Sequence, residues 1–148
     1  IIITIETEGS HFVETDYPIN LLSLSPKFTN SIPVVGAVTP GGVTVDQKFV
    51  NIHNRKRMNT EAIKQMIDFH DDYHFKPVWD GTQENLDEIE AYRIELNIPK
   101  DKTYIMPAGD TRETLIEMYP KVFDLCAEHG YNMTGRDHII AFDTQRMV

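Results

Sequence analysis

The sequence predicts an α/β fold with a mostly parallel sheet, on three observations. Short apolar runs rich in β-branched residues occur near residues 1, 20, 48 and 103, and such runs are typical of buried strands. Patterns with a helical period separate several of these runs, as in parallel strands joined by crossover helices. The length of 148 residues suits one ordinary core, so we expect a single domain over 1–148.

The predicted strands are segments in which apolar residues follow one another without a helical period. Pro77 indicates an edge or irregular position for one of them. Between 28 and 47, prolines and glycines predict a long irregular excursion, with a short hairpin around Pro40, Gly41 and Gly42. The predicted strands are 1–6, 19–24, 48–52, 75–79 and 102–106, and 139–142 is expected to return to the sheet.

Three amphipathic patterns predict helices. The first begins at Asn59 or Thr60, and the second begins at Thr82, because such residues cap helix N-termini. The acidic outer face of the second helix is expected to be solvated. It consists of Glu84, Asp87, Glu88 and Glu90.

The third helix is the longest. Asp110 and Glu113 resemble a capping box at its start, and Gly130 is expected to end it in a left-handed conformation. Pro120 lies inside and removes one backbone hydrogen bond, so we expect a kink there. Cys126 lies on the inner stripe and is interpreted as a small buried hydrophobe.

Composition excludes several classes of function. The net charge of −9 repels phosphate backbones, which argues against nucleic acid as a direct ligand. The sequence has no apolar run of the ~20 residues that cross a bilayer, so we expect no membrane partner and a cytoplasmic location. Cys126 is the single cysteine, so the chain alone forms no disulfide, no cysteine-ligated zinc site and no iron–sulfur cluster.

The carboxyl ends of parallel strands meet at one edge, where such folds bind ligands. That edge collects the polar and glycine-containing segments that follow the predicted strands. They are 6–10, 25–27, 51–54, 79–80 and 106–110. The pattern therefore predicts a site at this edge, with no metal ligands and no assigned catalytic residue.

Four segments, in this order, resemble the radical S-adenosylmethionine family of 7-carboxy-7-deazaguanine synthases. Glu6-Thr7-Glu8-Gly9-Ser10 is similar to the family's E-T-N-G-T turn, and 20–27 resembles its fourth strand with the S-P-K ending. The stretch 104–113 resembles its Y-L-M-P-E-G-x-T-R-E motif, and 126–139 its closing C-x-x-H-G-[FY]…R-x-H-I pattern. The family's three-cysteine loop and its G-G-E-P turn do not occur in this sequence.

The resemblance implies the C-terminal portion of an incomplete (β/α) radical-SAM barrel. The implied reaction converts 6-carboxy-5,6,7,8-tetrahydropterin to 7-carboxy-7-deazaguanine in queuosine or other 7-deazapurine biosynthesis, and the sequence leaves open whether the product serves tRNA modification or DNA modification. The implied cofactors are S-adenosylmethionine, a [4Fe-4S] cluster whose ligands lie outside this sequence, and Mg²⁺. The chain alone is then expected to be inactive, and its implied partner is either a second copy or a missing N-terminal half.

The resemblance also implies roles for individual residues. Thr7 and His138 would bind the pterin. Each residue has a plainer interpretation: a turn glycine or serine, a solvated lysine, a strand-to-helix corner, or a structural histidine. The cofactor would be held by Gly9, Ser25, Pro26, Lys27, Met106, Pro107, Ala108 and Gly109.

Two other functions stay open on the sequence. The chain is either a non-catalytic or split half that binds a nucleotide-like ligand or a partner chain, or part of another radical-SAM activating enzyme. The missing cysteines favour the first, and the segments 106–109 and 138–139 favour the deazaguanine enzyme over the second.

Overall fold

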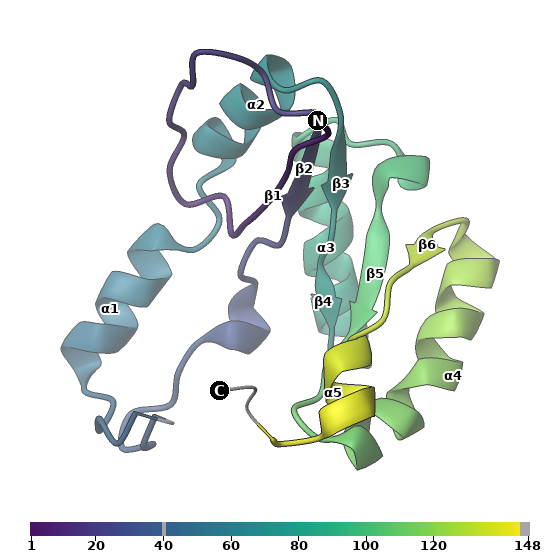
Figure 1. Cartoon of the computed structure of the whole chain (residues 1–148). Coiled ribbons are helices and arrows are strands. Elements are labelled where there is room, and N and C mark those ends of the chain that lie inside the picture. Colours follow the sequence, from purple (N-terminus) through teal and green to yellow (C-terminus); the bar gives the residue numbers. More distant parts are fainter. Residues whose placement is uncertain (40, 146–148) are drawn as a thin grey trace.

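The computed structural model describes residues 1–39 and 41–145 as an α/β arrangement of short strands and helices (Figure 1). Pro40, placed by the sequence in a hairpin, lies outside the described residues. The flanking chain does form that hairpin, because Val38 pairs antiparallel with Thr44 and Thr39 N donates to the Val43 carbonyl at 2.8 Å. No helix of the described part of the chain has the length and apolarity needed to cross a bilayer.

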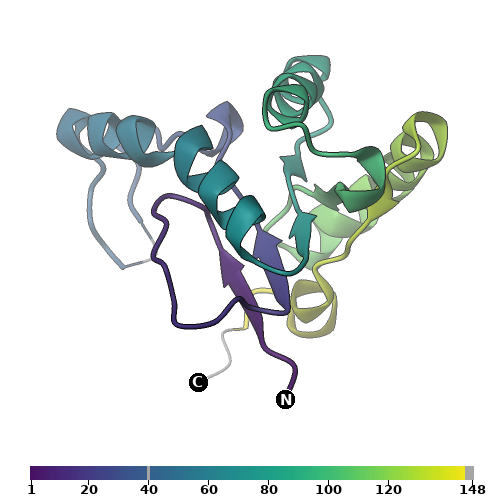
Figure 2. The ribbon, with the colours of Figure 1, turned by 90° about the horizontal axis from the view of Figure 1, so that it is seen from above.

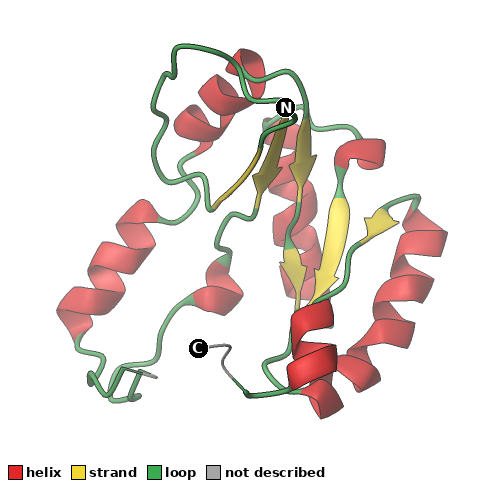
Figure 3. Cartoon of the chain, viewed as in Figure 1, coloured by secondary structure: helices red, strands yellow, loops and turns green. Residues whose placement is uncertain are grey.

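The named strands β1 to β6 pair in parallel, which agrees with the prediction of a mostly parallel sheet, but they form two small sheets and not one (Figure 3). Lys76 and Pro77 separate the two sheets, and proline has no N–H to continue a ladder. Lys76 N nevertheless donates to Leu24 O at 2.6 Å, and Met106 N to Pro77 O at 2.9 Å. The first sheet holds β1 (Thr4–Thr7), β2 (Leu21–Leu24) and β3 (Tyr73–Phe75), and the second holds β4 (Val78–Trp79), β5 (Tyr104–Pro107) and β6 (Asn132–Met133).

The strands lie side by side in chain order, and β3 and β4 together pair with β2 on one side and β5 on the other. The long helices that connect them, α2 (Thr60–Phe69), α3 (Gln83–Glu95) and α4 (Arg112–His129), lie on one side of the strands (Figure 2). This order without reversal is that of a β/α sheet wound in one direction. Two single turns of 3-10 helix, Thr29–Ser31 and Lys100–Lys102, complete the connections.

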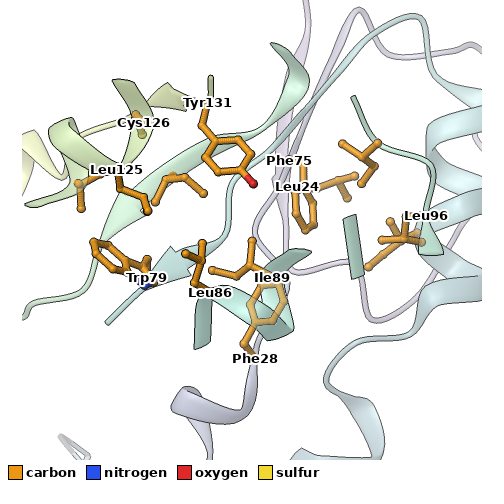
Figure 4. Packing of buried hydrophobic residues seen from close by; sticks show 14 of the residues in the cluster. Leu24, Phe28, Phe75, Trp79, Leu86, Ile89, Leu96, Leu125, Cys126 and Tyr131 are labelled. Atoms are coloured by element: carbon orange, nitrogen blue, oxygen red, sulfur yellow. The ribbon is translucent and has the colours of Figure 1, made fainter. Parts of the chain in front are cut away.

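The core lies between these helices and the strand face toward them (Figure 4). Leu24, Phe75 and Ile105 come from three different strands and are fully buried, as are Ile63 and Ile89 from two helices. Burying each of these side chains contributes about 1.5–3 kcal/mol relative to exposing it. Alternation along the strands places the intervening residues on the other face of the sheet.

The prediction of a strand at 48–52 is wrong, because this segment lies within α1 (Gln47–Lys56). The Asp46 side chain accepts a hydrogen bond from Phe49 N at 2.7 Å and caps the helix. Only Val50 of this helix is buried. A helix satisfies its backbone hydrogen bonds internally, whereas a strand here would need a neighbour that the sheet does not provide.

The prediction of a strand at 139–142 is also wrong, because α5 (Asp137–Phe142) occupies that segment. Arg112 explains the helix end: its guanidinium donates to Ile140 O at 2.7 Å and to Ala141 O at 2.9 Å. These carbonyls have no partner within the helix, so a cation there is favourable. The short strand β6 was not predicted.

Helix starts and ends agree closely with the sequence. Asn59 caps α2 and Thr82 caps α3. Gly130 ends α4 with a φ of 75°. The capping box of α4, however, is Thr111 with Thr114, one residue later than the predicted pair, since both hydroxyls bond the opposite backbone N–H.

The acidic face of α3 is solvated only in part. Glu84 and Asp87 are exposed, whereas Glu88 and Glu90 are half-buried. Glu88 accepts hydrogen bonds from Thr29, and Glu90 accepts from Arg93 and Tyr131. The structure therefore corrects the expectation for these two residues, because both carboxylates form hydrogen bonds and ion pairs with other side chains.

Candidate functional site

A cavity of about 440 Å³ opens at the carboxyl ends of β2, β4 and β5. Three turns form most of its wall, each directly after a strand, which is where parallel sheets bind ligands. Its volume lies in the range typical of small-molecule sites. The lining residues are Pro26, Lys27, Phe28, Asn30, Ser31, Val78, Asp80, Ala108, Gly109, Asp110 and Arg136.

The structure thus brings Pro26, Lys27, Ala108 and Gly109, predicted from two distant segments, into one cavity. Parallel pairing causes this convergence. Ala108 N donates to the Trp79 carbonyl at 2.9 Å, which extends the pairing of β4 and β5 to the cavity rim.

Position 109 has no space for a side chain, so a glycine is required there. Its φ is +154°, and a Cβ there would lie 2.8 Å from Thr114 Oγ1 and 2.9 Å from Leu115 Cδ2. Arg136 Nη1 donates to the Gly109 carbonyl at 2.6 Å and fixes the outer side of the turn. Both contacts pre-form the rim, which lowers the cost of ordering it around a ligand.

The cavity carries charges of both signs beside apolar surface. Lys27 and Arg136 are cationic, Asp80 and Asp110 are anionic, and Phe28 contributes a ring. Asp80 Oδ1 accepts from Thr82 N at 2.9 Å and from Thr82 Oγ1 at 2.6 Å, which holds its carboxylate in place. Such a lining suits a small ligand that combines a ring with both ammonium and carboxylate groups.

Ser25, Met106 and Pro107 lie next to this cavity in sequence but do not line it. Ser25 N donates to the Thr7 carbonyl at 2.8 Å, so its backbone extends the pairing of β1 and β2. Pro107 is buried toward the core, and Met106 is half-buried on the strand.

Thr7 is the last residue of β1 and Gly9 lies in the turn that follows, and neither lines the cavity. Thr7 Oγ1 accepts from Gly9 N at 3.1 Å. Gly9 has a φ of +77°, and a Cβ there would lie 2.7 Å from Ile63 Cγ1. The turn therefore packs on α2 without space for a side chain at Gly9. His138 is exposed on α5 and does not line the cavity either.

The other lining residues were not predicted as site residues, although Asp80 and Asp110 lie in segments expected at this edge. They are Phe28, Asn30, Ser31, Val78, Asp80, Asp110 and Arg136. Asp80 lies in the 79–80 segment expected at this edge, and its hydrogen bonds from Thr82 also hold the turn before α3. Its position directly after β4 was the available signal. Arg136 lies in the closing R-x-H pattern, whereas Asn30 is brought in by the 3-10 turn, for which the sequence carries no clear signal.

A polar row crosses the sheet face opposite the core, where Glu6, Ser23 and His74 are register neighbours. Lys76 Nζ lies 2.8 Å from Glu6 Oε1, and this hydrogen bond, with the Lys76 charge, lowers the pKa of Glu6. Burial lowers the pKa of His74, whose ring lies 4.2 Å from that of Tyr104. This face therefore presents an ion pair and a predominantly neutral imidazole near pH 7.

Cys126 is buried on α4, as predicted, and its Sγ donates to Asn132 O at 3.3 Å. Burial raises the pKa of its thiol to about 11, so the thiolate needed for metal binding is disfavoured. Within residues 1–39 and 41–145, no group of three or more histidine, cysteine or carboxylate side chains is arranged to hold a metal ion.

Comparison with known proteins identifies relatives of this chain. It is 29% identical over 142 residues to the 7-carboxy-7-deazaguanine synthase of Halobacterium salinarum, covering 92% of this chain and 52% of that protein. It is 30% identical over 144 residues to the synthase of the same name from Rhodopirellula baltica, covering 97% of this chain and 52% of that protein. The chain is related to the 7-carboxy-7-deazaguanine synthases.

These relatives confirm the family resemblance drawn from the sequence motifs. The chain spans about half the length of the curated relatives it matches. A shorter match, 25% over 63 residues, joins it to the 7-carboxy-7-deazaguanine synthase of Pyrobaculum aerophilum and covers 43% of this chain and 28% of that protein. No family model matches the chain, and no solved structure does.

Proposed function

We propose that the chain is the C-terminal portion of a radical S-adenosylmethionine 7-carboxy-7-deazaguanine synthase with an incomplete β/α barrel. The proposed substrate is 6-carboxy-5,6,7,8-tetrahydropterin. The observation that carries the proposal is the convergence of Lys27 and the 108–109 turn in one cavity, from the two segments that carry family motifs. The match to curated synthases over nearly the whole chain supports it.

The residues of the cavity fit S-adenosylmethionine. This cofactor combines a purine ring, an ammonium and a carboxylate, and the cavity offers the Phe28 ring, Asp80 and Lys27. Lys27 would hold the carboxylate by a charge-assisted hydrogen bond, and the turn at Ala108 and Gly109 would contact the purine ring. When bound and reduced by one electron from a cluster held outside this chain, S-adenosylmethionine would release methionine and supply the 5′-deoxyadenosyl radical that removes a hydrogen from the substrate.

The task of this chain is then positioning. The tight turn at Gly109, fixed by Arg136, holds one wall of the cavity in a single conformation. A rigid wall keeps the adenosyl group beside one C–H bond and excludes water, which is what such chemistry demands of a protein.

The chain does not fit the cluster or a metal ion. A [4Fe-4S] cluster needs several cysteine thiolates, and the single cysteine is buried on α4 with a raised thiol pKa. We infer that the cluster ligands come from sequence outside this chain, and we assign no Mg²⁺ ligand to it. The same observation keeps a non-catalytic, ligand-binding half as the second candidate.

The test combines this chain with the cysteine-bearing half of a matched relative under anaerobic, reducing conditions. With S-adenosylmethionine and the pterin, we expect 5′-deoxyadenosine and 7-carboxy-7-deazaguanine, both detected by mass spectrometry. Cofactor binding without either product would favour the non-catalytic half. Cleavage of the cofactor without conversion of the pterin would favour another radical-SAM enzyme.

Two variants locate the cofactor. Lys27→Gln is expected to weaken binding of S-adenosylhomocysteine about tenfold, the usual effect of losing one charge-assisted hydrogen bond. Lys48→Gln is the matched control, because Lys48 is exposed and does not line this cavity. Equal affinity of both variants would remove Lys27 from the site.

A further inference from the structure

Basic residues are concentrated in one segment of this acidic chain. The stretch 47–57 contains Lys48, Arg55, Lys56 and Arg57 and no acidic residue, although the net charge of the whole chain is −9. The stretch consists of α1 and its C-cap Arg57. The motifs shared with the synthase family do not include it. A local positive field of this kind attracts anions.

A second cavity, of about 150 Å³, lies between α1 and the turns that follow β1 and β2. We call it the α1 cavity. The cationic side chains of Lys27, Lys56 and Arg57 line it, and Glu8 is the single acidic residue in its lining. Its volume is several times the ~30 Å³ share of a water molecule, which is enough for a phosphate or carboxylate group.

The three cations that line the α1 cavity differ in whether they already form an ion pair. Arg57 Nη1 pairs with Glu88 at 3.2 Å and Arg57 Nε donates to Asn54 Oδ1 at 3.2 Å, so its guanidinium is held at the wall. Neither Lys27 nor Lys56 forms an ion pair with another residue that the structure describes. Their charges therefore remain available to a ligand.

His53 supplies a second, independent observation. Its ring lines the α1 cavity, and its Nδ1 is buried without a hydrogen-bond partner among the described residues. A buried polar atom without a partner costs about 1–3 kcal/mol. Because Nδ1 has no exposed surface, a ligand oxygen reaches it only when the His53 ring turns toward the cavity, and the resulting hydrogen bond would offset this cost.

We propose that the α1 cavity binds a small oxyanion, the phosphate or carboxylate group of a ligand, held by Lys27, Lys56 and His53. The site is distinct from the larger cavity, although Lys27 lines both. It does not rest on the proposed synthase function, because Lys56 and His53 of α1 line this cavity alone and neither cluster nor pterin is required.

The test titrates the whole chain with inorganic phosphate, and separately with acetate, at constant ionic strength set by chloride. Amide chemical shifts of ¹⁵N-labelled protein report the bound position, and we expect saturable changes at His53 and Lys56. Saturation by phosphate alone assigns a phosphate group, and saturation by acetate as well assigns an oxyanion in general. Absence of saturable changes in both titrations overturns the proposal.

Variants separate the cavity from the general charge of the helix. Lys56→Gln and His53→Phe are each expected to weaken binding about tenfold. Lys48→Gln removes the same charge from the same helix, but Lys48 does not line the α1 cavity. We expect it to change the affinity less than twofold. An equal loss in Lys48→Gln and Lys56→Gln would show diffuse attraction to α1 and contradict a site.

Discussion

Two parts of the molecule are built very differently. In the part from 58 to 133, each long helix buries several apolar side chains against the strands, Ile63, Ile89 and Val122 among them at 0% exposure. In the 29–57 segment, Val45 and Val50 are the buried apolar residues of the described positions. Val34, Val35, Val38, Val43, Phe49 and Ile52 of the same segment are exposed.

The two parts are stabilised by different interactions. The first part is stabilised by a shared core, so its helices unfold together. The 29–57 segment is tied at both ends to one carboxylate: Thr29 Oγ1 donates to Glu88 at 2.5 Å and Arg57 Nη1 at 3.2 Å. With so little buried area, the segment is expected to open on its own. It contributes five of the seven residues that line the α1 cavity.

The largest effect is expected from Ile89→Ala, at the centre of the core. Removing this side chain leaves a cavity among well-packed neighbours and lowers the free energy of unfolding by about 3–4 kcal/mol. Val50→Ala in the 29–57 segment should lower it by about 1 kcal/mol. Urea denaturation followed by circular dichroism measures both. Similar losses in the two variants would mean that the segment belongs to the same cooperative unit.

The second-largest effect is expected from Gly9→Ala, which should lower the free energy of unfolding by about 3 kcal/mol. The variant combines an unfavourable positive φ with a Cβ placed 2.7 Å from Ile63 Cγ1. Gly42→Ala is the matched control: its φ is +78°, but nothing lies within 4 Å of its Cβ position. It should cost about 1 kcal/mol. If both variants lose the same stability in thermal unfolding, the turn at Gly9 is not packed against α2.

Glu88→Gln should release the 29–57 segment without unfolding the core. The variant loses the charge that Thr29 and Arg57 share, and we expect a local loss of about 1–2 kcal/mol. Native-state hydrogen exchange should show faster exchange in α1 with unchanged rates in α3. Equal acceleration in both helices would contradict separate opening.

The smallest effect concerns Glu90, whose pKa is lowered by hydrogen bonds from Arg93. Because the folded pKa lies below the ordinary value of 4.5, the interaction stabilises the fold at neutral pH and is lost as pH falls through the folded pKa. Glu90→Gln should therefore cost about 1 kcal/mol at pH 7 and nothing at a pH below that pKa. Glu84→Gln, on the exposed face of α3, should cost nothing at either pH.

Much of the fold was predictable because its signals are local. Asn59, Thr82 and Gly130 mark helix ends through bonds to their own backbone neighbours. Thr82 and Gly130 were predicted, and Asn59 was one of the two predicted caps of α2. The segments 48–52 and 139–142 were assigned to strands and are helices. Short apolar runs fit either element, and the absence of a free neighbouring strand decides between them.

For the site, the sequence placed Pro26, Lys27, Ala108 and Gly109 at one edge, because parallel strands end together. It also placed Asp80 at this edge without assigning it to the site, and it did not find Asn30 or the α1 cavity. These depend on how an irregular segment returns to the sheet, which no periodicity encodes.

By itself, the sequence determined the α/β class, the cap of α3 at Thr82, the end of α4 at Gly130, the lack of cysteines for a cluster and the relationship to one synthase family. Those properties depend on neighbouring residues and on composition. Only the tertiary structure decided that Lys27 lies between two cavities and that Glu88 ties both ends of the 29–57 segment. Such contacts join residues far apart in the chain, and they form only once the core has fixed the helices around the strands.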